Sequence, residues 1–127
     1  NFNPTKVSLQ GAKDQIHSII SSVFPKEAEI RIHPDLDSYK AGVNWNLNDD
    51  PERPNKKSQT IVLEVTQELI EDLPQLSPSQ QDAALRMIER HLREKLKSFD
   101  PSNDAPYGSP VPAVTWRIDL TVAGLTN

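Results

Sequence analysis

Apolar residues recur in two rhythms along the chain, and each rhythm predicts a different element. In the first rhythm they return every three or four positions, which is typical of a helix with one buried stripe. The N-terminal segment has this spacing, and we expect Ser8 to cap a helix that ends at Pro25. Its stripe consists of Leu9, Ala12, Ile16, Ile19, Ile20 and Val23.

A second helix has the clearest boundary signal in the chain. Ser77 supplies a cap, Pro78 suits the first helical position, and Gln80 stands where its side chain can reach back to the cap. The sequence therefore predicts a helix from about 78 to 98, preceded by a short helical turn at 69–76. Its buried stripe consists of Leu85, Ile88, Leu92, Leu96 and Phe99.

In the second rhythm apolar and polar residues alternate, which predicts strands with one buried face. Trp45 and Trp116 both fall on apolar faces, so we interpret them as core residues. Val62 adds an apolar residue to the other face of its strand, which favours a central position for that strand. The four alternating segments are residues 28–33, 41–48, 60–66 and 114–122.

These elements predict an α+β fold in the order α-β-β-β-α-β. We expect a two-layer sandwich, with about four mostly antiparallel strands and two helices on one face of the sheet. The length of 127 residues fits a single domain over 1–127, with loose tails at 1–6 and 123–127. The connections at 48–58 and 100–112 are rich in proline and polar residues, so we expect both to be exposed.

Composition limits the classes of function. Fourteen basic and 18 acidic residues give a net charge of −4, which makes nucleic acid an unlikely partner of the molecule as a whole. The apolar runs are too short to span a bilayer, so we expect a soluble chain that binds no membrane. The lack of cysteine removes disulfides and thiolate metal sites. No targeting segment is visible, and the cytoplasm is the default expectation.

Candidate catalytic or metal-binding groups are few. His33, Asp35 and Asp37 stand close together, but Pro34 prevents a helix that would bring them to one face. The histidines at positions 17 and 91 have no metal-ligand partner four residues away, and phosphate-binding or nucleophile motifs are absent. The sequence therefore predicts no catalytic residue, no metal and no cofactor, and it favours a non-enzymatic protein.

Two surface features could bind a partner. Arg86, Arg90, Arg93 and Lys97 follow one another along the second helix at spacings of four, three and four, away from its apolar stripe. This basic strip is either a solvated helix face or a docking strip for an acidic partner. Tyr107 stands alone in a stiff loop, where it could anchor an interface or fold back onto the core.

The polar side of the sheet is a third candidate surface. It lacks the exposed aromatic residues with which RNA-binding sheets stack bases. It is therefore either a wet sheet face or a platform for another protein or a second copy of the chain. Its expected members are Glu29, Arg31, Asn44, Asn46, Glu64, Thr115, Arg117 and Asp119.

We expect a protein-interaction or accessory domain. The order of helix, three strands and helix over about residues 8 to 98 is similar to that of double-stranded-RNA-binding domains, which implies nucleic-acid binding through the second helix as an alternative. That family opens its second helix with a basic cluster, whereas residues 77–82 here read Ser-Pro-Ser-Gln-Gln-Asp, so we carry no sites over. A further alternative is an acidic secretion chaperone, whose dimers also combine helices with a twisted sheet, and a small hydrolase ranks last.

Overall fold

A computed structural model describes residues 6–33, 38–48, 50–102 and 113–125. The predicted helix over 78–98 and the short helical turn before it are both confirmed. The elements are α1 (Lys6–Val23), β1 (Glu29–His33), β2 (Tyr39–Asn44), β3 (Ile61–Val65), α2 (Gln67–Asp72) with a following 3-10 turn (Leu73–Gln75), α3 (Pro78–Ser98) and β4 (Val114–Ile118).

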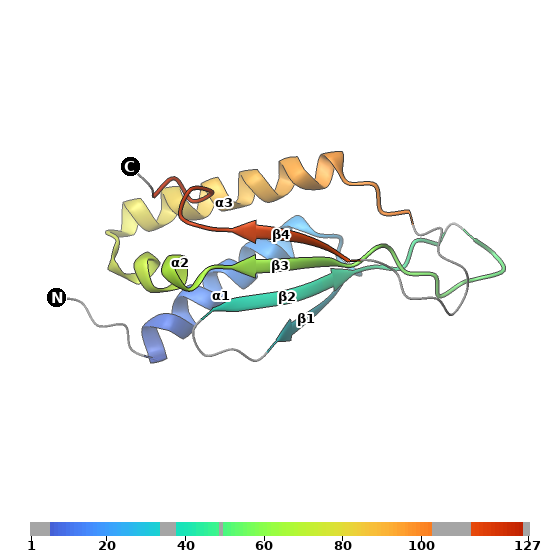
Figure 1. Cartoon of the computed structure of the whole chain (residues 1–127), viewed down its shortest axis with the longest axis horizontal. Coiled ribbons are helices and arrows are strands. Elements are labelled where there is room, and N and C mark those ends of the chain that lie inside the picture. The colour runs from blue at the N-terminus through green and yellow to red at the C-terminus, as the bar shows by residue number, and fades with distance from the viewer. Residues whose placement is uncertain (1–5, 34–37, 49, 103–112, 126–127) are drawn as a thin grey trace.

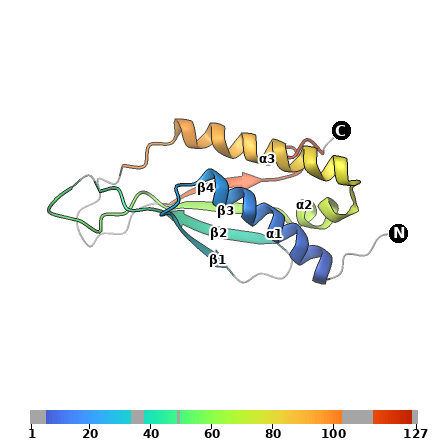
Figure 2. The same cartoon turned by 180° about the vertical axis from the view of Figure 1, so that it is seen from behind.

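The strands form one sheet in the order β1-β2-β3-β4, and the helices lie on one side of it (Figures 1 and 2). The pairings of β1 with β2 and of β2 with β3 are antiparallel, whereas β4 runs parallel to β3. The last pairing is parallel because α3 carries the chain back to the end of the sheet at which β3 begins. The α+β two-layer arrangement is confirmed, and β3 has the central position that Val62 suggested.

The core lies between the sheet and the two long helices. The predicted stripes of α1 and α3 supply Ile16, Ile20, Ile88 and Leu92, all fully buried, and Leu63 meets them from the centre of the sheet. Burying each such side chain contributes about 1.5–3 kcal/mol relative to leaving it in water. The three-and-four spacing therefore identified the helix faces correctly.

The start of α3 shows why its boundary was readable from sequence. The Ser77 hydroxyl accepts a hydrogen bond from the Gln80 backbone N–H at 3.3 Å, and the Gln80 side-chain oxygen accepts one from the Ser77 N–H at 3.1 Å. Both bonds use backbone donors that the helix itself leaves free. This reciprocal pair fixes the helix start at Pro78.

The two ends of the described chain differ from expectation. Helix α1 begins at Lys6, so Ser8 lies within the helix and not at the position that precedes it. The backbone hydrogen bonding extends further back because neither Lys6 nor Val7 opposes a helix. Strand β4 ends at Ile118 instead of continuing to 122.

The chain leaves the β4 direction because Asp119 starts a turn. Its side-chain oxygen accepts a hydrogen bond from the Val122 N–H at 3.1 Å, and Gly124 follows with a φ of 72°. Ala123 is 2 % exposed and Leu125 packs against the core, so residues 123–125 are no loose tail. Residues 1–5 and 126–127, the rest of the expected tails, lie outside the described part of the chain.

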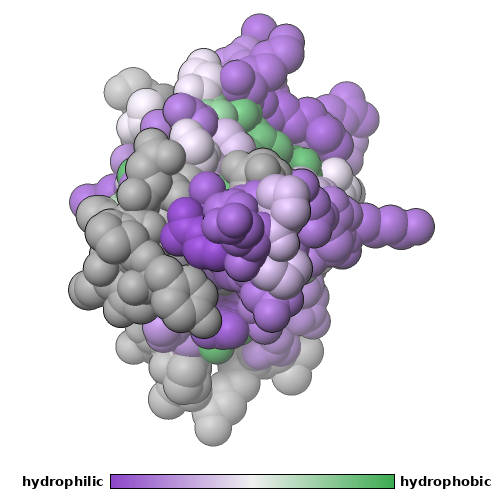
Figure 3. Space-filling model, turned by 90° about the vertical axis from the view of Figure 1, so that its right-hand side faces the viewer, coloured by the Kyte–Doolittle hydropathy of each residue, from purple (hydrophilic) through white to green (hydrophobic). Residues whose placement is uncertain are grey.

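Strand β1 is less buried than its alternating pattern predicts. Ile32 is 54 % exposed, because β1 is an edge strand and no further strand of the described part of the chain lies beyond it. The connection from β2 to β3 is largely exposed as expected, except at Ser58, which is 2 % exposed and accepts a hydrogen bond from the Trp45 N–H. The connection extends the hairpin through an Asn46–Lys57 bridge, and an Arg53–Asp50 ion pair of 3.2 Å lies near its tip. The end of the molecule towards which it projects presents mainly hydrophilic residues (Figure 3).

Candidate functional site

The basic strip on α3 is present, and its arginines are exposed and paired. Arg86 contacts Asp82 at 2.5 Å, Arg90 contacts Glu94 at 3.4 Å, and Arg93 contacts Glu89 at 3.5 Å. Each carboxylate stands four residues away on the same helix. Lys97 is exposed in the last turn. The surface of α3 therefore alternates in charge, and Tyr107 lies outside the described residues.

The side of the sheet opposite the helices is uncovered by any described helix (Figure 1). We call it the open face. It consists of Lys40, Gly42, Asn44, Val62, Glu64, Thr115 and Arg117, with Glu29, Arg31 and His33 at its β1 edge. Asn46 and Asp119, which we expected here, lie beyond the strand ends, where Asn46 donates to the Pro54 carbonyl and Asp119 makes its turn.

One row across the open face is charged in three adjacent strands. The register places Lys40 beside Glu64 and Glu64 beside Arg117. Lys40 Nζ lies 3.5 Å from Glu64 Oε1, and both side chains are 45 % exposed. Within the described residues, Arg117 forms no ion pair. This row therefore presents one exposed guanidinium, Arg117, whose charge no described residue compensates by a direct contact.

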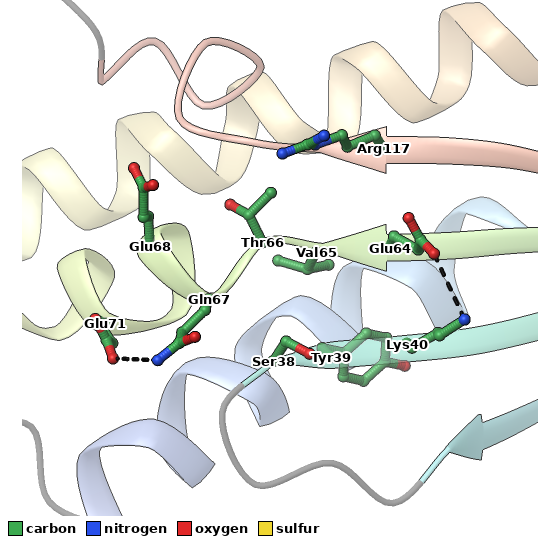
Figure 4. A pocket seen from close by; sticks show the side chains of 10 residues that line it. All are labelled: Ser38, Tyr39, Lys40, Glu64, Val65, Thr66, Gln67, Glu68, Glu71 and Arg117. Carbon is green, nitrogen blue, oxygen red and sulfur yellow. Dashed lines mark hydrogen bonds and ion pairs between the residues drawn. The ribbon is translucent and has the colours of Figure 1, made fainter.

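A hollow of about 830 Å³ opens beside this row. Its lining comes from the start of β2, the end of β3, helix α2 and Arg117 of β4. Figure 4 shows Arg117 extending along β4 on one side of the hollow and the α2 carboxylates on another side. The lining residues are Ser38, Tyr39, Lys40, Glu64, Val65, Thr66, Gln67, Glu68, Glu71 and Arg117.

Local sequence explains how α2 comes to line the hollow. Thr66 directly follows β3, and its hydroxyl accepts a hydrogen bond from the Leu69 N–H at 3.4 Å, which starts the helix at once. Because Leu69 and Ile70 turn into the core, Glu68 and Glu71 remain on the outer side. Glu71 accepts a hydrogen bond from the Gln67 amide at 2.9 Å (Figure 4). The hollow thus has carboxylates on α2 and a guanidinium on β4.

A second, smaller hollow of about 230 Å³ lies between α1 and the β1–β2 end of the sheet. Here His17 Nδ1 lies 2.9 Å from the Tyr39 hydroxyl. Tyr39 is 3 % exposed, and burial raises the pKa of its hydroxyl to about 12. The phenol therefore stays protonated at neutral pH, where its contact with His17 joins α1 to β2.

A third hollow of about 480 Å³ is lined by α3 and Trp116. Burial is the main cause that lowers the pKa of His91, and the nearby positive charge of Lys95 lowers this pKa further. Lys95 Nζ lies 5.7 Å from the centre of the Trp116 ring, which is the geometry of a cation–π contact. Trp116 also contacts Phe24 and Phe99 at ring-centre distances of 6.2 and 5.6 Å. The residues around this hollow therefore belong to an aromatic cluster of the core.

The described residues contain no group of three or more His, Cys, Asp or Glu side chains placed to hold a metal ion. None of the helices described here is both long and apolar enough to cross a bilayer. Comparison with family models, curated proteins and solved structures finds no match for this chain.

The sequence pattern predicted the positions of some residues that line the main hollow, but it did not predict the hollow itself. Alternation placed Glu64 and Arg117 on the polar face, but it did not include Lys40 because the strand was expected to begin at Ala41. Glu68 and Glu71 were missed because a six-residue helix has no stripe long enough to show which residues it leaves outside. The signal available was Thr66, a capping residue directly after a strand.

Proposed function

We propose that the chain is a non-enzymatic protein-interaction domain, and that its partner binds on the open face around the hollow between α2 and β4. The observation that carries the proposal is the exposed Arg117 guanidinium, which has no ion pair among the described residues. It lies in a charged row beside a hollow lined by three strands and α2.

The ion pairs already present on α3 explain why Arg117 suits an interface better than the basic strip on α3 does. Arg86, Arg90 and Arg93 each contact a carboxylate already, so a partner must displace one carboxylate to supply another. Arg117 gains a charge-assisted hydrogen bond without losing one. Arginine is also enriched among the residues that dominate binding energy at protein interfaces.

The charges around the hollow indicate the chemistry of the partner. A carboxylate would meet Arg117, and a basic or amide group would meet Glu68 on the α2 side. An extended segment of a protein supplies both kinds of group over a short length, since its side chains alternate every 3.3 Å or so. The partner we propose is therefore an extended protein segment that contains at least one acidic residue.

Nucleic-acid binding through α3 remains the alternative function. The affinity for nucleic acid depends on the number of phosphates that basic side chains neutralise, because each neutralised phosphate releases a counterion from the nucleic acid. The paired carboxylates of α3 lower the net positive charge of this helix face, so the structure adds no observation in favour of this alternative.

A library of displayed peptides tests the proposal. The protein should select peptides that contain Asp or Glu, and Arg117→Glu should weaken their binding about tenfold or more. Replacing the selected acidic residue by Lys should restore binding to the Arg117→Glu variant, because both charges of the pair are then reversed. Arg90→Glu is the matched control, since Arg90 is an exposed arginine on α3, and it should bind as the wild type does.

Three outcomes would contradict the proposal. They are a failure to select any peptide, equal binding by the wild type and Arg117→Glu, and a loss of binding in Arg90→Glu alone. The last result would assign the interface to the strip on α3.

A further inference from the structure

Strand β1 ends the sheet on the side away from β4, so one of its edges has no hydrogen-bonded neighbour among the described residues. Only Ile30 of its five residues is even half-buried, and Ile32 has the greatest exposure of any large hydrophobic side chain described. A free strand edge presents a row of backbone donors and acceptors to another strand. Edge and exposed side chain together mark β1 as a surface for strand pairing.

Three features that often protect an edge, namely a bulge, a proline and a lysine, are absent from the five residues of β1. Its five residues pair one-to-one with β2 from Glu29–Asn44 to His33–Lys40, without a bulge. None of the five is a proline or a lysine, the residues that most often block edge pairing. The edge is short but regular, and it can accept a strand of matching length.

We propose that β1 pairs antiparallel with β1 of a second copy of this chain, about a twofold axis at Ile30. The two sheets would then join into one sheet of eight strands. In this register Glu29 stands opposite Arg31 of the second copy, and symmetry repeats the pair. Ile30 stands opposite itself, and Ile32 stands opposite Ala28. The charged pairs lie on the open face, and the apolar pairs lie on the helix side.

Self-complementarity of the strand is the reason for choosing a second copy as the partner. Glu29 and Arg31 already form an exposed ion pair of 3.2 Å within one chain. Pairing replaces the two contacts of this kind, one in each copy, by two equivalent contacts across the axis, so no charge is left alone. Opposite charges that face each other across antiparallel strands favour pairing, and like charges oppose it.

Other registers are less favourable. An axis at Arg31 would place Arg31 opposite itself, and an axis at Ile32 would place Arg31 opposite His33. A register shifted by a single residue would turn the second copy over, so that its isoleucines would lie on the side of the first copy's open face and its charges on the helix side. Only the axis at Ile30 combines two opposite-charge pairs with apolar contacts for Ile30 and Ile32.

Charge reversal tests this register directly. Sedimentation velocity of the full chain should show a reversible dimer that forms as the concentration rises to about 1 mM, since a small interface of this kind is weak. Arg31→Glu and Glu29→Arg should each raise the dimer Kd by about tenfold, because each sets like charges opposite each other twice. The double variant Glu29→Arg/Arg31→Glu restores opposite charges, and its Kd should return to within about threefold of the wild-type value.

Arg117→Glu is the matched control, since it reverses an exposed arginine on the same face at the other edge of the sheet. It should leave the dimer Kd unchanged. Circular dichroism of each variant checks that the exposed substitutions leave the fold intact. A wild type that stays monomeric to about 1 mM would overturn the proposal. So would single reversals without effect, a double variant as weak as the single ones, or a dimer lost in Arg117→Glu.

Discussion

His17 Nδ1 lies 2.9 Å from the hydroxyl of Tyr39, and this contact ties the middle of α1 to the first residue of β2. Their rings are tilted by 56° with centres 6.2 Å apart, so the hydrogen bond and ring packing act together. The Tyr39 side chain is buried next to His17. The pair therefore links the helix layer to the sheet at the β1–β2 side of the core.

Tyr39→Phe should lower the free energy of unfolding at neutral pH by about 1 kcal/mol, because the histidine loses its partner. Burial raises the Tyr39 pKa from 10.0 to about 12, so the folded state holds the proton more tightly than the unfolded state does. The stability that this proton contributes is complete below pH 10 and is lost as the pH rises through about 12. Urea titrations of both proteins should therefore show a difference that shrinks across that range. A difference that stays constant to pH 12 would contradict the burial of this hydroxyl.

Trp116→Ala should lower the free energy of unfolding by about 3–5 kcal/mol, the range for emptying a large aromatic site. Trp116 is 7 % exposed and packs against Phe24 and Phe99, so its removal takes away the contacts that these two rings make with it. Thr115→Ala is the control, because Thr115 points to the open face and is exposed. It should cost less than about 1 kcal/mol. Equal losses in a denaturant titration would mean that the two faces of β4 are reversed.

Ser77→Ala should cost about 0.5–2 kcal/mol, because it removes the hydroxyl that accepts the hydrogen bond from the Gln80 backbone N–H. Ser77→Asp should keep most of the stability, because a carboxylate also accepts from the Gln80 N–H and carries a charge that suits a helix N-terminus. Thermal melts of the three proteins give the comparison. Identical melting temperatures would show that the cap contributes nothing to α3.

The wild type should bind neither duplex RNA nor duplex DNA at physiological salt, because each strip arginine is paired and the chain is acidic overall. Changing Arg86, Arg90 and Arg93 to Glu should destabilise α3 by only about 0.5 kcal/mol per reversed pair. Fluorescence anisotropy at two salt concentrations measures both proteins. Micromolar, salt-sensitive binding that the triple variant loses would instead establish the strip as a nucleic-acid surface.

Local rules carried much of the fold prediction. The stripe that contains Ile88 and Leu92, with the cap at Ser77, was sufficient to place α3 at its observed ends. Alternation in Val114–Ile118 likewise placed the strand and its faces. These signals are local, because a helix face or a strand face repeats within a few residues.

Tertiary features were harder to predict. Alternation continues through Leu120 and Val122, but the Asp119 side chain and the positive φ at Gly124 turn the chain. Leu120 and Val122 therefore stay partly buried without belonging to a strand. The exposure of Ile32 depends on which strand forms the edge of the sheet, which the pattern of β1 alone does not contain. The hollow beside Arg117 joins residues from four elements, so it exists only once the sheet is assembled.

Methyl chemical shifts measure most directly whether a partner binds on the open face. Val62 and Thr115 carry methyl groups on that face, whereas Met87 is 44 % exposed on α3 and reports on the helix layer. Titration with a peptide selected by the wild type should shift the Val62 and Thr115 methyl signals and leave the Met87 methyl signal in place. A shift of Met87 with Val62 and Thr115 unchanged would place the partner on the helix side and contradict the proposed interface.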